Sequence, residues 1–520
     1  MAEGVVQPFE TRARERARVK TTKGFKIMRN RSVEYRGAGH PEMIRKSSAH
    51  WQMFRGRLAS PAMTKRILLA AVAALALPLP ALAQTHDVAA LRDAALKDDV
   101  AWDVVEGLTT EIGQRLAATE AEARARAWAV KKLTALGFKN VRIETYKMPL
   151  WERGLETAEV LGGSAQKLTI AALGNSGSTG PKPIEAEVAY FPTLADLQAA
   201  PAEAVKGKIV FVSNAMTPTQ DGSQYGYYGA ARRAGPNIAA SKGAAAILIR
   251  SIGTDYHRNP HTGVTNWAKG VSPIGAAALS LPDAEQLVRL LKRGPVKLRV
   301  QITAGMKGEA ESGNVIAEVP GSDPSAGIIL VGGHLDSWDL GTGAIDDGAG
   351  VAITTAAAKR IMDAGQPRRT IRVVWFGAEE PGGFGGDAYA RAHANERHVL
   401  AQESDFGADR VWKFETNLPE GAKPIADRLA AALAPLGISR GRGTAHGGTD
   451  VGPVINTGVG VIDMSQDGLR YFDYHHTPDD TLGKIDPEQL RQNVAAWTAM
   501  LAVTANAPED IGPIPKGEGE

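Results

Sequence analysis

Residues 371–383 read IRVVWFGAEEPGG. The first part is an apolar run rich in β-branched and aromatic residues, which predicts a buried β-strand. The run stops at a small residue and is followed by two adjacent carboxylates, Glu379 and Glu380. Successive side chains of a strand point in opposite directions. We therefore expect the two carboxylates to face different surroundings and to have different functions.

The same pattern of apolar strand, polar loop and helix repeats from about residue 310 onward. GIILVGG and GVGVIDM predict further strands, and DDGAGVAITTAAAKRIM predicts a helix. Asp486 and Pro487 are suited to the N-cap and first position of a last helix. This alternation indicates an α/β fold with a mostly parallel mixed sheet, covered by helices on both faces. In such sheets ligands bind beyond the carboxyl ends of the strands.

Residues with metal-binding side chains follow these predicted strands. They are His334 and Asp336, Asp346 and Asp347, Glu379 and Glu380, Glu403 and Asp405, and His475 and His476. The chain has no cysteine, which excludes thiolate metal sites, cysteine nucleophiles and disulfides. Imidazoles with several carboxylates suit zinc or a similar divalent ion.

So many clustered carboxylates would raise one another's pKa unless cations were present. Two divalent ions that share one carboxylate would neutralise the cluster. In two-metal sites the ions lie roughly 3.5–4 Å apart and activate a shared water. A nearby carboxylate that binds no metal can then take the proton of that water.

Five motifs in this half of the chain resemble peptidase family M28, the co-catalytic zinc exopeptidases. They are HLDSWDLGTGAIDDGAG (334–350), FGAEEPGGFGG (376–386), ESDFG (403–407), GGTDVGP (447–453) and YHHTPDDT (474–481). They occur in the order typical of the family. The resemblance implies a zinc-exopeptidase fold of the phosphorylase/hydrolase-like kind, with two divalent ions, zinc being the expected metal.

The resemblance also implies a role for individual residues. Asp346 would bridge both ions, Glu380 and His476 would complete one site, and His334 and Asp405 would complete the other. Glu379 would be the general base. Asp336 would orient the His334 imidazole, and Asp480 would hold the His476 loop. Each residue stands at the matching position of its motif.

Several alternatives stay open at this point. Glu403 could replace Asp405 as a ligand, His475 could replace His476, and Asp347 fits a helix cap better than a ligand. His446, Asp450 and Tyr474 are candidates for the substrate pocket. His257 and His261 lie in a polar loop, where we expect solvated side chains.

The part of the chain after residue 83 is expected to form two domains and a short tail. Residues 84–170 and 306–510 are expected to form the peptidase domain, and residues 511–520 a tail. Residues 171–305 are rich in short strands and resemble a smaller protease-associated domain inserted into the peptidase.

The N-terminal residues predict export. Residues 1–62 hold fourteen Lys/Arg and five acidic residues without apolar periodicity, so we expect a disordered leader or a start misplaced upstream of Met63. Residues 63–83 resemble a signal peptide that ends in Ala81-Leu82-Ala83, with a retained signal anchor as the alternative. We therefore expect a periplasmic or secreted protein without a stable membrane span.

Charge argues against nucleic acid as a partner. Without residues 1–83 the chain has 44 Lys/Arg and 52 Asp/Glu, a net charge of −8.

The expected function, which the resemblance implies, is metal-dependent hydrolysis of dipeptides or short peptides, as a carboxypeptidase or dipeptidase. An aminopeptidase with the same site is the main alternative. A one-zinc glutaminyl cyclase or a non-catalytic binding relative is disfavoured, because all ligand positions and the base are filled. A homodimer is left open.

Overall fold

The computed structural model describes residues 87–512 and Ile514. These residues belong to one compact unit of the chain, Pro80–Glu520. The leader expected at 1–62 and the signal peptide expected at 63–83 lie outside the described residues. Of the helices described, none combines the length and the apolar character needed to cross a membrane.

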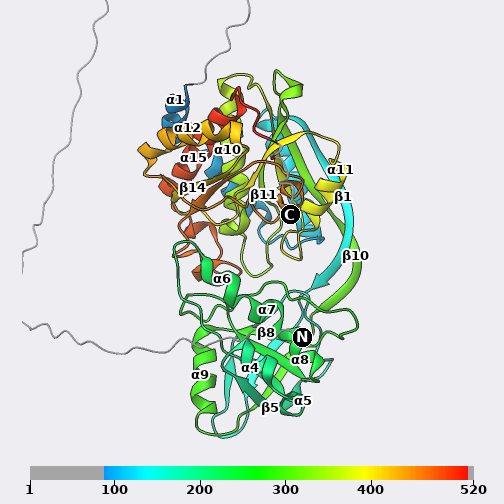
Figure 1. The fold of residues 1–520 in the computed structure, drawn as a ribbon. Helices are drawn as coiled ribbons and strands as arrows, with labels where there is room; N and C mark the ends of the chain where they lie inside the picture. Colours follow the sequence, from blue (N-terminus) through cyan, green and yellow to red (C-terminus); the bar gives the residue numbers. More distant parts are fainter. Residues whose placement is uncertain (1–86, 513, 515–520) are drawn as a thin grey trace, which may run out of the picture. The chain divides into compact units, whose positions relative to one another are not determined.

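A five-stranded sheet underlies the predicted motifs (Figure 1). In spatial order its strands are β1 (Lys139–Glu152), β10 (Gly305–Val319), β12 (Thr370–Phe376), β11 (Ile328–His334) and β13 (His398–Glu403). β12, β11 and β13 are parallel, whereas β10 is antiparallel to both β1 and β12. The sheet is therefore mixed, with two parallel and two antiparallel pairings, because β10 alone runs against its neighbours. The expectation that the sheet is mostly parallel is not confirmed.

Helices pack on both faces of this sheet. Ile371, Val373 and Trp375 of β12 pack in one core cluster with residues of α10 (Ala349–Ala364) and α15 (Pro487–Ala505). Their neighbours Val374 and Phe376 pack in another cluster with residues of α11 (Phe384–Ala392) and α13 (Gly452–Ile455). The strand is thus buried on both sides, which explains why its sequence is continuously apolar instead of alternating.

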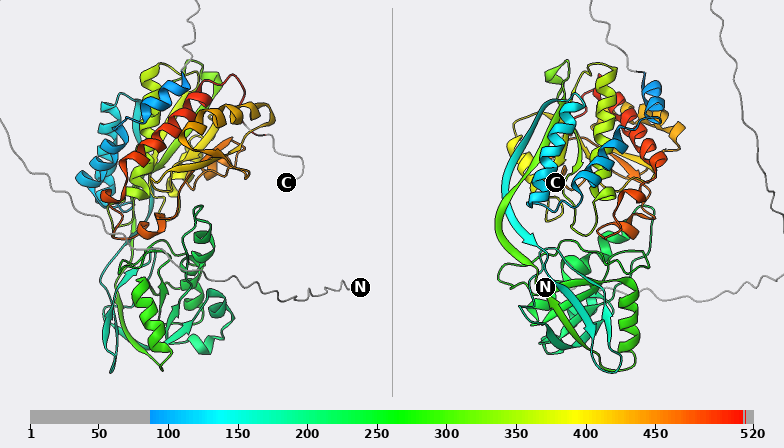
Figure 2. Two further views of the ribbon diagram at one scale, coloured as in Figure 1. Left: turned by 90° about the vertical axis from the view of Figure 1, so that its left-hand side faces the viewer. Right: turned by 180° about the vertical axis from the view of Figure 1, so that it is seen from behind.

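The helices of this part begin and end as follows: α1 (Val88–Ala95), α2 (Val100–Gly107), α3 (Glu120–Ala135), α10 (Ala349–Ala364), α11 (Phe384–Ala392), α12 (Lys423–Leu433), α13 (Gly452–Ile455), α14 (Tyr471–Tyr474) and α15 (Pro487–Ala505). Figure 2 shows α10 and α15 packed side by side. The predicted start of α15 is confirmed, since the Asp486 side chain accepts hydrogen bonds from the Glu488 and Gln489 N–H groups.

Two further sheets complete the fold. A small one contains β15 (Ser439–Arg440), β14 (Val411–Asn417) and β16 (Val461–Gln466). Residues 156–302, which we call the second-sheet region, contain a sheet of eight strands. In spatial order these are β3 (Gln166–Leu168), β2 (Glu156–Val160), β9 (Lys297–Ile302), β5 (Ile184–Phe191), β6 (Ile209–Val212), β7 (Ala246–Arg250), β8 (Gly275–Leu279) and β4 (Ile170–Ala172).

The second-sheet region lies in the chain between the paired strands β1 and β10. Its helices are α4 (Leu194–Ala199), α5 (Ala202–Val205), α6 (Ser223–Tyr228), α7 (Ala230–Arg233), α8 (Gly235–Ser241) and α9 (Leu281–Leu291). The expected domain boundary at residue 171 falls inside its sheet, because β2 pairs with both β3 and β9. We therefore begin the region at residue 156.

Candidate active site

Three strand ends at one edge of the five-stranded sheet supply the predicted site. β11 ends at His334, β12 ends at Phe376 just before the two glutamates, and β13 ends at Glu403 just before Asp405. Because these strands are parallel neighbours, their carboxyl ends meet at the same edge.

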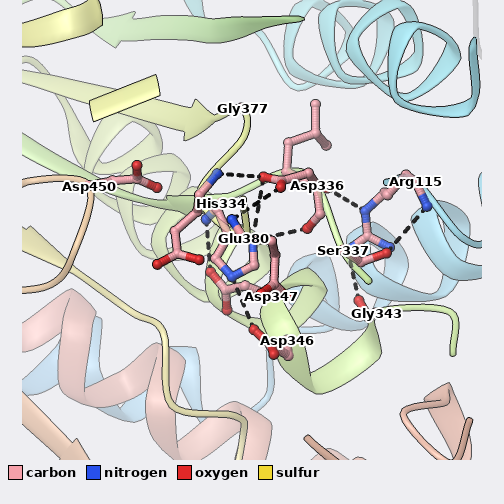
Figure 3. Close-up of polar contacts among 12 residues, drawn as sticks. Arg115, His334, Asp336, Ser337, Gly343, Asp346, Asp347, Gly377, Glu380 and Asp450 are labelled. Carbon is pink, nitrogen blue, oxygen red and sulfur yellow. Dashed lines mark hydrogen bonds and ion pairs between the residues drawn. The ribbon is translucent and has the colours of Figure 1, made fainter. Parts of the chain in front are cut away.

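Asp346 lies beside His334, in the segment that leads into α10 (Figure 3). One carboxylate oxygen, Oδ1, lies 3.0 Å from His334 Nε2. The other, Oδ2, lies 3.1 Å from His476 Nε2. The two sides of a single carboxylate therefore face two different imidazoles.

Two groups of potential metal ligands share Asp346. His334, Asp346 and Asp405 form one, and Asp346, His475 and His476 form the other. Glu380 belongs beside the second group, since its Oε2 lies 3.0 Å from His476 Nε2. The structure thus brings together all five side chains that the sequence motifs predicted as ligands.

The glutamate pair lies in a turn and not at the end of a strand. β12 stops at Phe376, and Ala378 then adopts a φ of 57°, a left-handed conformation that is uncommon outside glycine. The Glu379 carbonyl accepts hydrogen bonds from the N–H groups of Gly382 and Gly383. This turn, and not the strand alternation that the sequence suggested, therefore separates the two carboxylates.

Asp336 contacts this turn rather than only His334. Its two carboxylate oxygens accept the Glu379 N–H at 3.0 Å and the Glu380 N–H at 3.3 Å. His334 Nδ1 lies 2.9 Å from the backbone oxygen of Asp336 and 3.7 Å from its carboxylate. The backbone of Asp336 therefore contacts the imidazole, while its side chain fixes the glutamates.

The loop that contains Asp346 is held from two sides. Asp480 Oδ1 accepts the N–H groups of Ala344 and Ile345, each at 2.7 Å. Asp480 thus ties its own loop, which contains His476, to the loop that contains Asp346. Arg115, which the sequence analysis missed, is fully buried and donates to the Thr342 and Gly343 carbonyls at 2.6 and 2.8 Å.

Asp347 has a structural role. Its Oδ2 accepts the His334 N–H at 3.0 Å, and its Oδ1 accepts the Gly350 N–H at 2.9 Å. It therefore joins the end of β11 to the first turn of α10. The peptide bond between Asp346 and Asp347 is cis.

The protonation of the site reflects many acids buried together. Burial raises the pKa of Glu380 to about 7, and it raises the pKa of Glu379 well above the ordinary range of a glutamate. Burial would lower the pKa of His334, but the carboxylates of Asp346 and Asp405 raise it well above 6.5. Without cations, this cluster cannot hold all its carboxylates in the charged form at neutral pH.

The donor set fits divalent cations. Asp346 Oδ2, Glu380 Oε1 and Asp405 Oδ1 are buried and have no hydrogen-bond partner. Buried carboxylate oxygens rarely lack partners unless they bind a metal or protonate. The atoms that converge are imidazole nitrogens and carboxylate oxygens, the ligands that zinc prefers when thiolates are absent.

The alternative ligands are placed differently. Glu403 lies outside both candidate ligand groups, and its Oε2 accepts the Asp450 N–H at 2.9 Å. His475 stacks on His476 with ring centroids 3.5 Å apart, and its Nε2 lies 3.4 Å from Asp346 Oδ2. Glu380 forms its ion pair with His476 and not with His475, which favours His476 as the ligand.

A cavity of about 470 Å³ opens onto the site. Glu379, Glu380, Asp346, Asp405 and His476 lie in its wall. The second-sheet region contributes Tyr225, Arg232, Val264 and Asn266 to the same wall. These residues could not be found from the sequence, because they approach the site only through long-range packing and carry no local motif.

None of the three residues expected in the substrate pocket lines the 470 Å³ cavity. His446 lines a neighbouring cavity of about 530 Å³, which also contains Glu403 and Asp405. Asp450 is fully buried and lines neither cavity, and its Oδ1 accepts a hydrogen bond from the Gly386 N–H. Tyr474 faces a separate small hollow with Lys484.

Of the two histidines expected in solvent, His257 is exposed, with 69% of its side-chain surface accessible. The prediction was wrong for His261, which is 2% exposed and lies 5.9 Å from His475 between ring centroids. The loop that contains His261 looks polar in the sequence but is covered by the peptidase loop that contains His475.

Comparison with known proteins identifies the family. The sequence model of peptidase family M28 matches residues 314–501. Carboxypeptidase Q from Bos taurus is 35% identical over 407 residues, which cover 77% of this chain and 84% of the relative. The chain belongs to peptidase family M28. It is accordingly a metallo-exopeptidase, as its five motifs predicted.

Further proteins are similar to this chain. Carboxypeptidase Q from Homo sapiens is also 35% identical, over 77% of this chain and 84% of its own. The crystal structure of a peptidase M28 precursor from Shewanella amazonensis is 44% identical and superimposes with a TM-score of 0.80, covering 83% of this chain and 98% of that one. A zinc aminopeptidase from Bacillus subtilis shares the fold at 20% identity and a TM-score of 0.57, with 79% of this chain and 97% of that one covered.

Proposed function

We propose that this M28 member hydrolyses dipeptides or short peptides with two divalent ions, zinc being the expected metal. The observation that supports it most is the shared carboxylate of Asp346. Its two oxygens lie 3.0 Å from His334 Nε2 and 3.1 Å from His476 Nε2. Asp346 would bridge the ions, His334 and Asp405 would complete one site, and Glu380 and His476 would complete the other.

When bound, the ions would supply Lewis acidity toward the scissile carbonyl and toward water. Glu379 is suited to proton transfer, because it lines the cavity and its carboxylate makes no hydrogen bond within the described residues, where its backbone N–H and carbonyl are both bonded. Its carboxylate would take the proton of the attacking water and pass it to the departing amine. Asp336 would keep Glu379 in place through the turn backbone.

Arg232 favours recognition of a free carboxylate at the substrate's C-terminus. It is the only Arg or Lys among the described residues that line the 470 Å³ cavity. Its Nη1 donates to the Thr262 carbonyl, whereas its Nη2 makes no hydrogen bond within the described residues and is not among the buried atoms without a partner. A guanidinium with unused N–H groups binds carboxylates well. We therefore place cleavage of the carboxypeptidase or dipeptidase type ahead of the aminopeptidase alternative.

A panel of dipeptides with blocked and free termini tests this polarity. We expect cleavage of substrates with a free C-terminus and loss of cleavage when that carboxylate is amidated. Arg232→Gln should raise KM for free-carboxylate substrates by about 10-fold or more, the effect of losing a charged hydrogen bond worth roughly 1.5–3 kcal/mol. Cleavage that requires a free N-terminus and tolerates the amide would favour an aminopeptidase. Cleavage that survives complete removal of metal would contradict the mechanism itself.

We also propose export to the periplasm or the medium, from the signal-like residues 63–83. The net charge of −8 without residues 1–83 fits peptide substrates and not nucleic acid. We also propose that the second-sheet region is a protease-associated domain inserted into the peptidase.

A further inference from the structure

His476 lies where the second-sheet region meets the peptidase loops. Its backbone φ is 58°, an unusual conformation for a residue other than glycine. Such a conformation costs on the order of 1–3 kcal/mol and persists only where surrounding contacts enforce it. One of the contacts on its backbone comes from the second-sheet region, since Thr262 donates its N–H to the His476 carbonyl.

Thr262 contacts His476 through both of its backbone groups. Its N–H donates to the His476 carbonyl at 3.0 Å. Its carbonyl oxygen lies 3.4 Å from His476 Nδ1. Because Nε2 faces Asp346 and Glu380, the Nδ1 atom must carry the proton when Nε2 binds a metal. The Thr262 carbonyl is then the acceptor for that proton.

Thr262 is itself held firmly. It is fully buried, and its Oγ1 donates to the Ala172 carbonyl at 2.7 Å. Arg153 Nη2 donates to the same Oγ1 at 3.2 Å. The hydroxyl therefore fixes the backbone group that faces the His476 imidazole.

Arg232 and Gly263 complete the contact. Arg232 Nη1 donates to the Thr262 carbonyl at 3.0 Å. It also lies 3.0 Å from His476 Nδ1, but a guanidinium only donates, so it cannot accept the Nδ1 proton of a metal-bound imidazole. A Cβ atom at Gly263 would lie 1.5 Å from Arg232 Nη1 and 2.8 Å from His476 Nδ1, and the φ of this glycine is 125°. Only a residue without a side chain lets the guanidinium and the imidazole approach this closely.

The opposite imidazole has no such dependence. His334 Nδ1 lies 2.9 Å from the backbone oxygen of Asp336, a residue of the peptidase part only two positions away. The site at His334 is therefore supported locally, whereas the site at His476 is supported across two parts of the fold.

We propose that Thr262 and Gly263 are positioning residues for His476, so that the second-sheet region sets the affinity of one of the two metal ions. This inference rests on the proposed function, because it takes His476 as a ligand. It follows that the two ions should differ in how strongly their binding depends on the second-sheet region. Disturbing the Thr262 contact should lower the affinity for the ion at Glu380 and His476 and leave the affinity for the ion at His334 and Asp405 unchanged.

The test is titration of metal-free protein with Zn²⁺ against a chromophoric chelator, repeated with Co²⁺ to record the absorption of each bound ion. The unmodified protein should bind two ions. Gly263→Ala should bind one ion normally and the other about 10–100-fold more weakly, the usual effect of losing a partner of a metal-bound histidine. The Co²⁺ spectrum should change for one ion alone. Gly163→Ala is the matched control, since a Cβ at this glycine meets no atom within 4 Å.

Thr262→Val keeps the shape of the side chain but removes the hydroxyl, and it decides the question if Gly263→Ala does not fold. We expect the same ion to weaken, and Thr262→Ser to restore it. Two ions of unchanged affinity in a folded Gly263→Ala protein, or in Thr262→Val, would overturn the inference. Equal weakening of both ions would also overturn it. Unmodified protein that binds no ion pair would instead contradict the proposed function.

Discussion

Glu379→Gln is expected to retain its metal ions and to lose turnover, with kcat falling by about 10²–10⁴-fold, the usual contribution of a general acid–base group. Glutamine keeps the size of the side chain and cannot take a proton from water. The backbone N–H that binds Asp336 is unaffected by the change, so the turn should persist. Metal content measured beside kcat and KM on a free dipeptide checks this expectation.

Glu380→Gln is the matched control, because it makes the same chemical change at the next residue. Glu380 Oε2 lies 3.0 Å from His476 Nε2, and its Oε1 is buried without a partner. We expect this variant to bind one ion more weakly and to recover part of its activity at high metal concentration. Excess metal should not rescue Glu379→Gln. Equal metal loss in both variants would mean that the two glutamates share one role.

The sequence could predict the site because its residues follow strand ends. His334, Glu380 and Asp405 lie just after three strands, and parallel strands place their carboxyl ends at one edge whatever the loops do. The family motifs added Asp346 and His476. These five side chains lie together in the structure, although their roles as ligands stay a prediction.

What the sequence could not predict depends on contacts between distant residues. Arg232 and Thr262 belong to the second-sheet region, and nothing near them in the chain signals that they contact His476. The antiparallel course of β10 and the turn at Ala378 also escaped prediction. Hydrophobic periodicity identifies strands but does not give their direction, and it does not show where a strand ends within an apolar run.

Removing the metal should make stability depend strongly on pH. Burial raises the pKa of Glu380 to about 7 in the metal-free fold, from an ordinary value near 4.5, and that of Asp480 to about 7 from 3.8. Between those ordinary values and pH 7 the folded chain keeps protons that the unfolded chain has released. The metal-free protein therefore loses stability as pH rises through this window, by on the order of 3 kcal/mol for Glu380 alone.

His334 and His476 act in the same direction, whereas His475 and His261, whose pKa is lowered by burial, act against them. Burial would lower the pKa of His476, but Glu380 and Asp346 raise it well above 6.5, and His334 is raised likewise by its own carboxylates. The stabilisation that these charged imidazoles give is complete below pH 6.5 and disappears as pH rises through their folded pKa values. Divalent ions replace those protons, and their affinity increases as the ligands deprotonate.

We therefore expect the difference in Tm between metal-loaded and chelated protein to be small near pH 5 and large near pH 8. Scanning calorimetry at several pH values, with and without chelator, measures it. A free ion concentration of 100 Kd alone adds about 2.7 kcal/mol to the loaded form. Chelated Glu380→Gln provides the control, because it lacks one titrating carboxyl and should lose less stability between pH 5 and 7. A chelated protein whose Tm follows that of the loaded protein at every pH would show that no ions neutralise this cluster, and the two-metal proposal would have to be abandoned.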